Sequence, residues 1–143
     1  MPEAQKKNTD NRKRVRKTHR VVRGQHRDER REDYVEAVYR RERKGDPTRV
    51  VDLQKVFGVS HVTVIRAVEK LESEGLLNRA DSGIGLTATG RKLGEKCYER
   101  HLLVETFLIS LGISEEIASR DAEGIEHHLS PETLKAMKKR LQD

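Results

Sequence analysis

TRVVDLQKVFGVSHVTVIRAVEKLES, residues 48–73, has the pattern of two short helices joined by a tight turn. Thr48 can cap the first helix, whose apolar residues are Val51, Leu53, Val56 and Phe57. Gly58-Val59-Ser60 forms the turn, and Ser60 can cap a second helix that continues to about Ser73. The apolar residues of the second helix recur at i, i+3, i+4 and i+7, as Val64, Ala67, Val68 and Leu71. This spacing is typical of a DNA-binding helix-turn-helix, whose second helix enters the major groove.

The other face of the second predicted helix carries side chains that suit contact with DNA. Val62 and Ile65 are unusual on a solvated surface but can pack against thymine methyl groups, and Arg66 can bind guanine or phosphate. Hydroxyl groups near the start of the helix are better placed for phosphate. The predicted DNA-binding residues are Ser60, His61, Val62, Thr63, Ile65 and Arg66, with Arg79 from the following hairpin. The alternative is that the apolar residues pack against another helix.

The flanking segments complete a winged helix-turn-helix. Residues 75–80 and 84–87 have the pattern of two short strands around the turn Asp81-Ser82-Gly83, which would form a small β-wing. A helix is predicted from about residue 28 to 44, and Gly45-Asp46-Pro47 ends it.

Beyond the wing, the pattern is helical throughout. Helices are predicted over 87–111, from 114 to about 129, and over 132–141. The second of these is expected to present apolar residues to the core, namely Ile117, Ala118, Ala122, Ile125 and Leu129. The predicted fold class is therefore mainly α, with a winged helix-turn-helix, a small β-wing and a helical C-terminal domain.

Composition indicates a small aliphatic core. Of the 143 residues, 34% are hydrophobic and 38% are charged, and there is no Trp. We expect a subunit interface to supply part of the buried area, because short chains with modest cores often complete themselves by oligomerising. No stretch approaches a membrane span, so a cytoplasmic protein is expected. Cys97 is the single cysteine, which excludes an internal disulfide and a thiolate zinc cluster; we expect it to be buried.

The positive charge is concentrated at the N-terminus. Residues 1–32 carry twelve Lys and Arg against five Asp and Glu, whereas residues 33–143 carry eighteen against nineteen. Residues 1–27 have no apolar face to bury, so we expect a basic arm that is disordered in the free protein. Such an arm can bind the DNA backbone or can merely aid solubility, and the neighbouring helix-turn-helix favours DNA.

A cluster of polar residues in the C-terminal half predicts a metal site. In Asp121-Ala122-Glu123-Gly124-Ile125-Glu126-His127-His128, a helix would place Glu123, Glu126 and His127 at i, i+3 and i+4 on one face. Like charges gathered on one face repel, and a bound cation or water relieves the repulsion. The rest of a ligand shell should therefore lie elsewhere in the chain.

Two upstream elements can supply it. Asp33 and Glu36 form an i, i+3 carboxylate pair, and His101 lies within an apolar stripe. Taken alone, the pair can be a solvated acidic face and the histidine a hydrogen-bonded core residue.

These motifs together resemble a known family. The winged helix-turn-helix, Asp33-Tyr34-Val35-Glu36, Tyr98-Glu99-Arg100-His101 and the run from Asp121 to His128 are similar to the manganese transport regulators of the diphtheria-toxin-repressor family of metal-dependent repressors. The likeness covers about residues 30–135. It implies a homodimer in which each subunit joins a DNA-binding domain to a C-terminal dimerisation domain. It also implies two metal ions per subunit, with Asp33 and His127 toward one ion, Glu36 and His101 toward the other, and Glu123 and Glu126 at both.

The ligand types favour manganese. Four carboxylates and two imidazoles without sulfur suit a hard ion such as Mn²⁺. Affinity alone would not exclude Zn²⁺, Co²⁺, Cd²⁺ or Fe²⁺, because Mn²⁺ is lowest in the Irving–Williams order. Metal would bridge a DNA-binding domain, residues 28–90, to a metal-binding and dimerisation domain, residues 91–143, and so order a dimer for operator DNA. We therefore expect a manganese-responsive repressor of manganese-uptake genes.

Two other functions could use the same acidic cluster or the same helix-turn-helix. A binuclear metallohydrolase would use carboxylate-bridged ions to activate water. The sequence has no Gly-rich phosphate loop, no His-Glu-x-x-His element and little length for a substrate cleft, so we expect no enzymatic activity. The other alternative is a metal-independent winged-helix DNA-binding protein whose acidic cluster is only structural.

Overall fold

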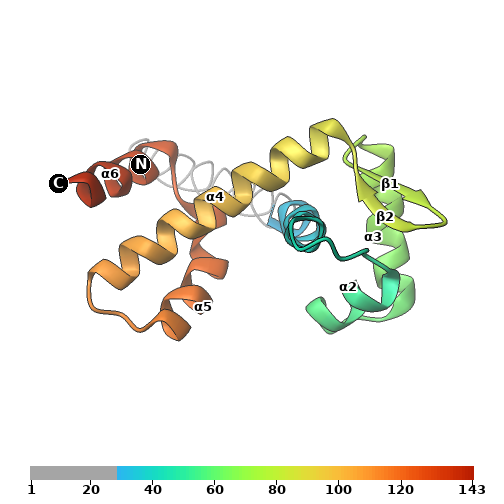
Figure 1. Ribbon diagram of the computed structural model, residues 1–143, viewed down its shortest axis with the longest axis horizontal. Coiled ribbons are helices and arrows are strands. Elements are labelled where there is room, and N and C mark those ends of the chain that lie inside the picture. Colours follow the sequence, from blue (N-terminus) through green and yellow to red (C-terminus); the bar gives the residue numbers. More distant parts are fainter. Residues whose placement is uncertain (1–28) are drawn as a thin grey trace, which may run out of the picture.

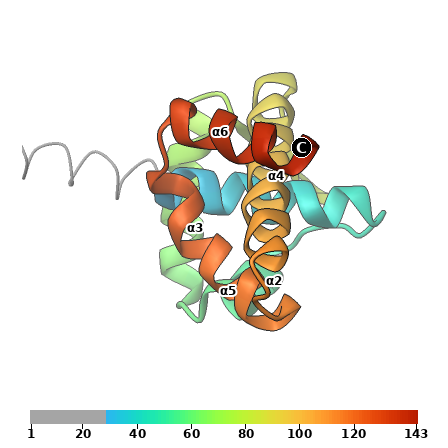
Figure 2. The same cartoon turned by 90° about the vertical axis from the view of Figure 1, so that its left-hand side faces the viewer.

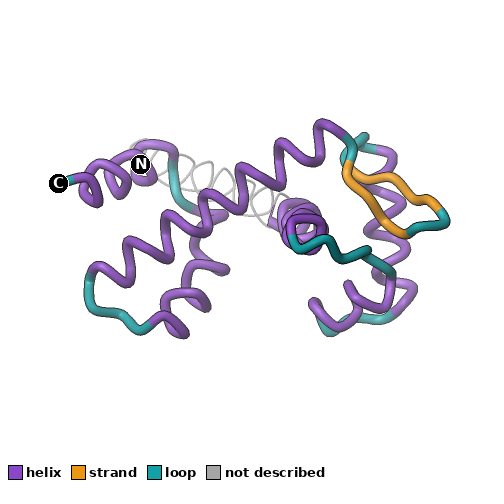
Figure 3. Tube along the Cα trace, viewed as in Figure 1, coloured by secondary structure: helices purple, strands orange, loops and turns teal. Residues whose placement is uncertain are grey.

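The computed structural model describes residues 29–143, in which one long helix joins two groups of shorter elements (Figure 1). The first group contains a helix over residues 29–43, α2 (Val50–Phe57), α3 (His61–Ser73) and a hairpin of β1 (Leu77–Ala80) and β2 (Gly83–Leu86). The long helix α4 (Ala88–Ser110) leads to α5 (Glu115–Ile125), the 3₁₀ turn η1 (Glu126–His128) and α6 (Pro131–Gln142). Within the described residues, strand is confined to the hairpin (Figure 3). The predicted mainly α fold is confirmed, whereas the predicted basic arm, residues 1–27, lies outside the described part.

The helix-turn-helix forms as its local sequence predicts. Gly58 ends α2 in the left-handed region, with φ of 62°, where a residue without Cβ is favoured. Ser60 Oγ accepts a hydrogen bond from Thr63 N at 3.2 Å and so caps α3. The facing apolar residues of the two helices are fully buried, namely Leu53, Val64 and Val68.

The start of α2 differs from the prediction. Thr48 does not cap the helix, because its backbone pairs with Ile84 of the wing, and Ile84 N donates to Thr48 O at 2.8 Å. Arg49 precedes the helix, and its N–H donates to Asp52 Oδ2 at 2.8 Å. The predicted wing turn is one residue shorter, since Gly83 is the first residue of β2.

The hydrophobic core lies where the 29–43 helix packs against the helix-turn-helix and the wing. Tyr34 of that helix stacks on Phe57 of α2, with ring centroids 4.4 Å apart. The buried core residues are Tyr34, Val35, Val38, Tyr39, Leu53, Val64, Val68, Leu71, Leu76, Leu77, Ile84 and Leu86. The core therefore holds the helix that carries Asp33 and Glu36 against the predicted DNA-binding helices.

Helix α4 is shared by both groups of elements. A Cβ at Gly90 would lie 1.9 Å from the backbone oxygen of Leu76, and one at Gly94 would lie 2.7 Å from Tyr39 Cβ. These two glycines let α4 pack closely on the base of the wing and on the 29–43 helix. Neither α4 nor any other described helix is long and apolar enough to cross a membrane.

The C-terminal helices fold back onto α4. Ala118 and Ala122 of α5 are fully buried against it, and α6 crosses it (Figure 2). Ile117 and Ile125 were expected in the core, but they are 49% and 39% exposed. Further large apolar side chains are exposed on α4 and the loop that follows it, namely Leu102, Ile109, Leu111 and Ile113. An apolar surface, defined by these six residues, therefore lies on the C-terminal half.

Candidate metal centre

Five of the six predicted metal ligands meet where the 29–43 helix approaches α4 and η1. Asp33 and Glu36 come from that helix, His101 from α4, and Glu126 and His127 from η1. Asp33 Oδ1 lies 2.8 Å from His127 Nε2, and His101 Nδ1 lies 3.4 Å from Glu126 Oε1. One ligand atom each from Glu36, Glu126 and His127 lies within 4.8 Å of the others. Side chains from three distant parts of the sequence thus share one site.

The backbone of the C-terminal ligand segment differs from the predicted continuous helix. Helix α5 ends at Ile125, and η1 follows as a 3₁₀ turn. Pro131 begins α6 and disfavours helical conformation in the residue before it, so the chain changes direction here. The side chains of Glu126 and His127 are only 1% exposed, whereas that of Glu123 is 58% exposed. The expectation that these three residues share one α-helical face was therefore wrong.

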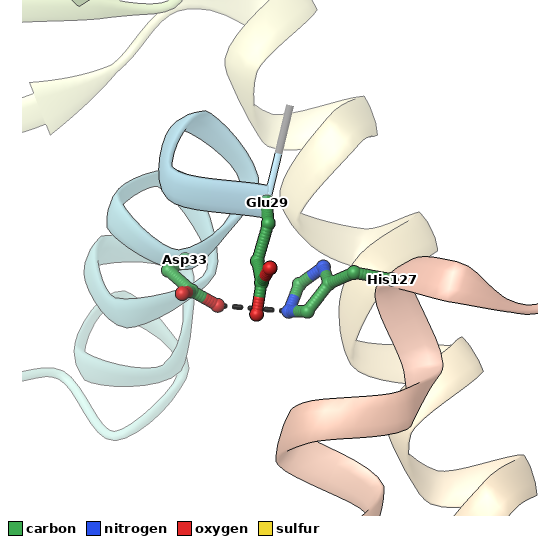
Figure 4. A group of neighbouring side chains, drawn as sticks. All are labelled: Glu29, Asp33 and His127. Carbon is green, nitrogen blue, oxygen red and sulfur yellow. Dashed lines mark ion pairs between the residues drawn. The ribbon is translucent and has the colours of Figure 1, made fainter. Parts of the chain in front are cut away.

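His127 lies between carboxylates of the 29–43 helix. Its Nε2 faces Asp33, and its Nδ1 lies 2.8 Å from Glu32 Oε2. Glu29, one turn before Asp33, also turns its carboxylate toward this ring (Figure 4), and one ligand atom each from Glu29, Asp33 and His127 lies within 4.8 Å of the others. Burial acts to lower the pKa of His127, but the carboxylates of Asp33 and Glu32 outweigh it and raise the pKa to about 10. In the metal-free protein the ring is therefore protonated at neutral pH, and an ion must displace that proton.

Glu126 is a buried carboxylate with one oxygen that lacks a hydrogen bond. Its Oε1 faces His101, whereas Oε2 has no hydrogen-bond partner among the described residues, although Arg100 Nε lies 3.6 Å away. Burial raises the pKa of the neighbouring Glu36, and the charge of Glu126 raises it further. An oxygen of Glu36 lies within 4.8 Å of an oxygen of Glu126. Two buried carboxylates this close repel each other, and a divalent cation would relieve that repulsion.

Arg100 of α4 supplies one positive charge inside the cluster. It pairs with Glu32, and its Nη2 lies 3.1 Å from His127 Nδ1. Burial acts to raise the pKa of Glu32, but the contacts with His127 and Arg100 outweigh it and lower the pKa to about 2. Glu32 is thus ionised at any pH near neutrality.

Arg40 of the 29–43 helix supplies a second positive charge. Its Nη2 lies 2.7 Å from Glu36 Oε1, and its Nη1 lies 3.4 Å from Glu123 Oε1. Glu123 is therefore joined to the site through Arg40.

Four residues of this cluster were missed by sequence reasoning: Glu29, Glu32, Arg40 and Arg100. A usable signal was present for three of them, because the pairs Glu29 and Asp33, Glu32 and Glu36, and Glu36 and Arg40 each stand at i, i+4 on one helix. No local signal identifies Arg100, whose partners are distant in the sequence.

The donor set fits a divalent metal ion. His127 Nε2 and Glu126 Oε2 are buried, yet neither has a well-directed hydrogen bond. Ligands at about 2.1 Å from one ion lie about 3 Å apart on adjacent positions, which is close to the spacing of His127 Nε2 and Asp33 Oδ1. Carboxylates and imidazoles without sulfur suit Mn²⁺. Cys97 offers no thiolate, because burial raises its pKa to about 12.

The predicted DNA-binding face of α3 is open to solvent. The exposed residues are Ser60, His61, Val62, Thr63 and Arg66, and Ile65 is half-buried. Val62 is 55% exposed, so no helix of the described part covers it. Arg79 of the wing lies 3.2 Å from Glu72 and 3.8 Å from Glu69, which holds its guanidinium over α3. These DNA-binding assignments stay predictions.

Comparison with known proteins agrees with this arrangement. Residues 87–143 match the family described as "Iron dependent repressor, metal binding and dimerisation domain", and residues 42–104 match "Methanogenesis regulatory protein FilR1, N-terminal domain". The transcriptional regulator MntR of Escherichia coli O6:H1 is 46% identical over 120 residues, which cover 83% of this chain and 77% of that protein. This chain belongs to the MntR family of transcriptional regulators. A second MntR relative, the HTH-type regulator of Geobacillus kaustophilus, is 42% identical over 100 residues, which cover 69% of this chain and 71% of the relative.

Solved structures extend the MntR likeness to three dimensions. The manganese regulator SloR superposes with a TM-score of 0.69 at 27% identity, over 78% of this chain and 53% of that one. A manganese-dependent transcriptional repressor in complex with manganese superposes with a TM-score of 0.67 at 28% identity, over 77% and 51%. This MntR-family chain thus spans about half the length of each of these two solved chains.

Proposed function

We propose that this chain is a manganese-responsive DNA-binding transcriptional repressor, which controls manganese-uptake genes in the cytoplasm as a homodimer on operator DNA. One observation carries the proposal: carboxylates on the helix that supports the helix-turn-helix lie against the imidazole of His127 on the C-terminal half, with Asp33 Oδ1 2.8 Å from His127 Nε2. A regulator needs metal binding to be coupled to the DNA-binding helices, and this contact spans the two parts. The manganese named for the solved regulator SloR and for the solved manganese-dependent repressor supports the choice of ion.

The proposed ligands divide between two ions in each subunit. Asp33 and His127 would hold the first, Glu36 and His101 the second, and Glu123 and Glu126 both. When bound, Mn²⁺ would supply positive charge shared by carboxylates that otherwise repel one another. We assign no catalytic residue, since binding alone performs this function.

The response depends on which element each ligand comes from. The 29–43 helix packs on the helix-turn-helix through core residues such as Val35 and Val38. The position of the 29–43 helix relative to α4 and η1 therefore determines the position of α3 relative to the C-terminal half. Without metal, the repulsion between Glu36 and Glu126 loosens the contact between the 29–43 helix and η1. A bound ion relieves that repulsion and favours a single position of the 29–43 helix relative to α4 and η1. A tenfold rise in DNA affinity requires only about 1.4 kcal/mol of coupling.

The surface of α3 supports the DNA-binding role. Ser60 and Thr63 lie at its N-terminus, where backbone N–H groups favour phosphate, and Arg66 follows on the exposed side. Val62 offers an apolar contact for thymine methyl groups. In a symmetric dimer, two copies of α3 would enter successive major grooves of a palindromic operator.

The apolar surface of the C-terminal half supports a homodimer. Its six large aliphatic side chains are exposed on α4, the following loop and α5. Several large apolar side chains exposed on one part of a protein often mark an interface. It lies within residues 87–143, which match the metal-binding and dimerisation domain.

Operator binding in the presence and absence of metal tests the proposal. Metal-free protein and a duplex from a manganese-uptake promoter are titrated with Mn²⁺, and DNA affinity is followed by fluorescence anisotropy. Affinity should rise at least about tenfold with Mn²⁺ in the wild type and much less in Asp33→Asn. Glu42→Gln removes an exposed carboxylate from the same helix and should behave as the wild type. Metal-independent binding by all three proteins would favour a winged-helix protein with a structural acidic cluster.

A further inference from the structure

The guanidinium of Arg40 lies among the residues assigned to the second metal ion. It contacts Glu36 at 2.7 Å and Glu123 at 3.4 Å, and these two carboxylates come from different elements. A guanidinium has donors arranged in a planar fork, which suits simultaneous contact with two carboxylates. One side chain therefore bridges the 29–43 helix to α5 without a metal ion.

The charge of Arg40 also acts on the other two members of this set. Burial acts to lower the pKa of Arg40, but Glu36, Glu123 and Glu126 together raise it. Glu126 raises the pKa of His101, whereas burial and the charge of Arg40 oppose that rise. All four residues assigned to the second ion therefore interact with this one guanidinium. Asp33, assigned to the first ion only, faces His127 instead.

A divalent ion and a guanidinium cannot share these carboxylates without repulsion, because two positive charges a few ångströms apart repel strongly at a partly buried site. Arg40 is able to leave, since its side chain is 34% exposed and solvent is within its reach. Binding of a second ion therefore includes the cost of breaking two ion pairs.

We propose that Arg40 holds the second metal position in the metal-free protein, so that the two ions bind in order, the first beside Asp33 and His127 and the second only when Arg40 withdraws. This inference rests on the proposed function. The first ion would act while Arg40 still contacts Glu36, which is assigned to the second ion only, and the second would bind only at higher metal concentration. Arg40 would thus set the range of metal concentration over which the protein responds.

Calorimetric titration of the full metal-free chain with Mn²⁺ tests this inference. The wild type should show two binding steps whose dissociation constants differ by about tenfold or more. In Arg40→Met the second step should tighten by about tenfold or more, while the first changes by less than about threefold. Arg40→Lys keeps a charge but lacks the fork, and its second constant should fall between the two. If circular dichroism shows that Arg40→Met is unfolded, Arg40→Lys tests the inference in its place.

Arg91→Met is the matched control. Arg91 forms an ion pair of the same length, 2.7 Å, with Glu42 of the 29–43 helix, away from the cluster. It should leave both steps unchanged. A second step that is unchanged or weaker in both Arg40 variants, relative to Arg91→Met, would overturn the role of Arg40 while leaving the proposed function intact. Absence of Mn²⁺ binding in every protein would overturn both.

Discussion

Replacing Arg100 by Met should destabilise the metal-free protein substantially. Arg100 pairs with Glu32 and also lies near Glu126 and His127, and its side chain is only 13% exposed. A carboxyl group whose pKa falls from 4.5 to about 2 on folding, as that of Glu32 does, contributes about 3 kcal/mol at neutral pH. Arg100 shares this contribution with His127. Because its loss also removes the guanidinium whose Nε lies 3.6 Å from Glu126 Oε2, we expect the free energy of unfolding to fall by about 2–4 kcal/mol.

The pH dependence makes this prediction specific. The pKa of Glu32 is lowered by folding, so its contribution is present above pH 4.5 and is lost as the pH falls toward 2. Urea unfolding followed by circular dichroism, in the presence of chelator, should show a large difference between wild type and Arg100→Met at pH 7 and a smaller one at pH 3. Arg91→Met removes an exposed pair and should cost at most about 1 kcal/mol. A loss for Arg100→Met no larger than for this control, or one that grows at low pH, would refute the reasoning.

Three further predictions concern packing, reactivity and assembly. Gly90→Ala should lower the free energy of unfolding by about 2 kcal/mol or more in urea titrations, because its Cβ would meet the backbone oxygen of Leu76. A Cβ at Gly124 would have nothing within 4 Å, so Gly124→Ala should be neutral or stabilising. Equal effects of the two substitutions would contradict the packing argument. Cys97, buried and with a pKa of about 12, should react with a thiol reagent at pH 8 only after unfolding, and rapid reaction of the native protein would disprove its burial. Ile117→Glu should convert the dimer to a monomer in light scattering while circular dichroism stays unchanged, and a persistent dimer would place the interface elsewhere.

The helix-turn-helix could be predicted from the sequence because its signals are local. Gly58 ends one helix and Ser60 starts the next, within three residues. The i, i+4 spacing of Val64 and Val68 then identifies the buried face of α3. Each signal acts within one helical turn, so the sequence alone suffices.

The local signal was misleading at Thr48 and around Glu126. Thr48 has a side chain suited to capping, but its backbone pairs with that of Ile84, a partner that only the folded wing supplies. The run that contains Glu126 has helical spacing, yet the helix ends at Ile125, and the 3₁₀ turn that follows is one of the short forms common at helix ends.

Five of the six residues predicted as ligands meet at the candidate site, whereas their counter-charges could not be predicted from the sequence. Asp33 and His127 are residue types that bind metal ions, and the resemblance to a family placed them together. The pairing of Arg100 with Glu32 joins residues 68 positions apart, which no periodicity reveals. Arg40 stands one turn after Glu36, but helical spacing does not disclose that its guanidinium also reaches α5.

The central claim is that metal binding and DNA binding are coupled, and the most direct test is the reciprocal measurement. The affinity of the full chain for Mn²⁺ is measured by calorimetry with and without a saturating operator duplex. Linkage requires that DNA tighten Mn²⁺ binding by the same factor by which Mn²⁺ tightens DNA binding, about 5–150-fold for a typical allosteric protein. Equal Mn²⁺ affinity in the presence and absence of operator would contradict the account.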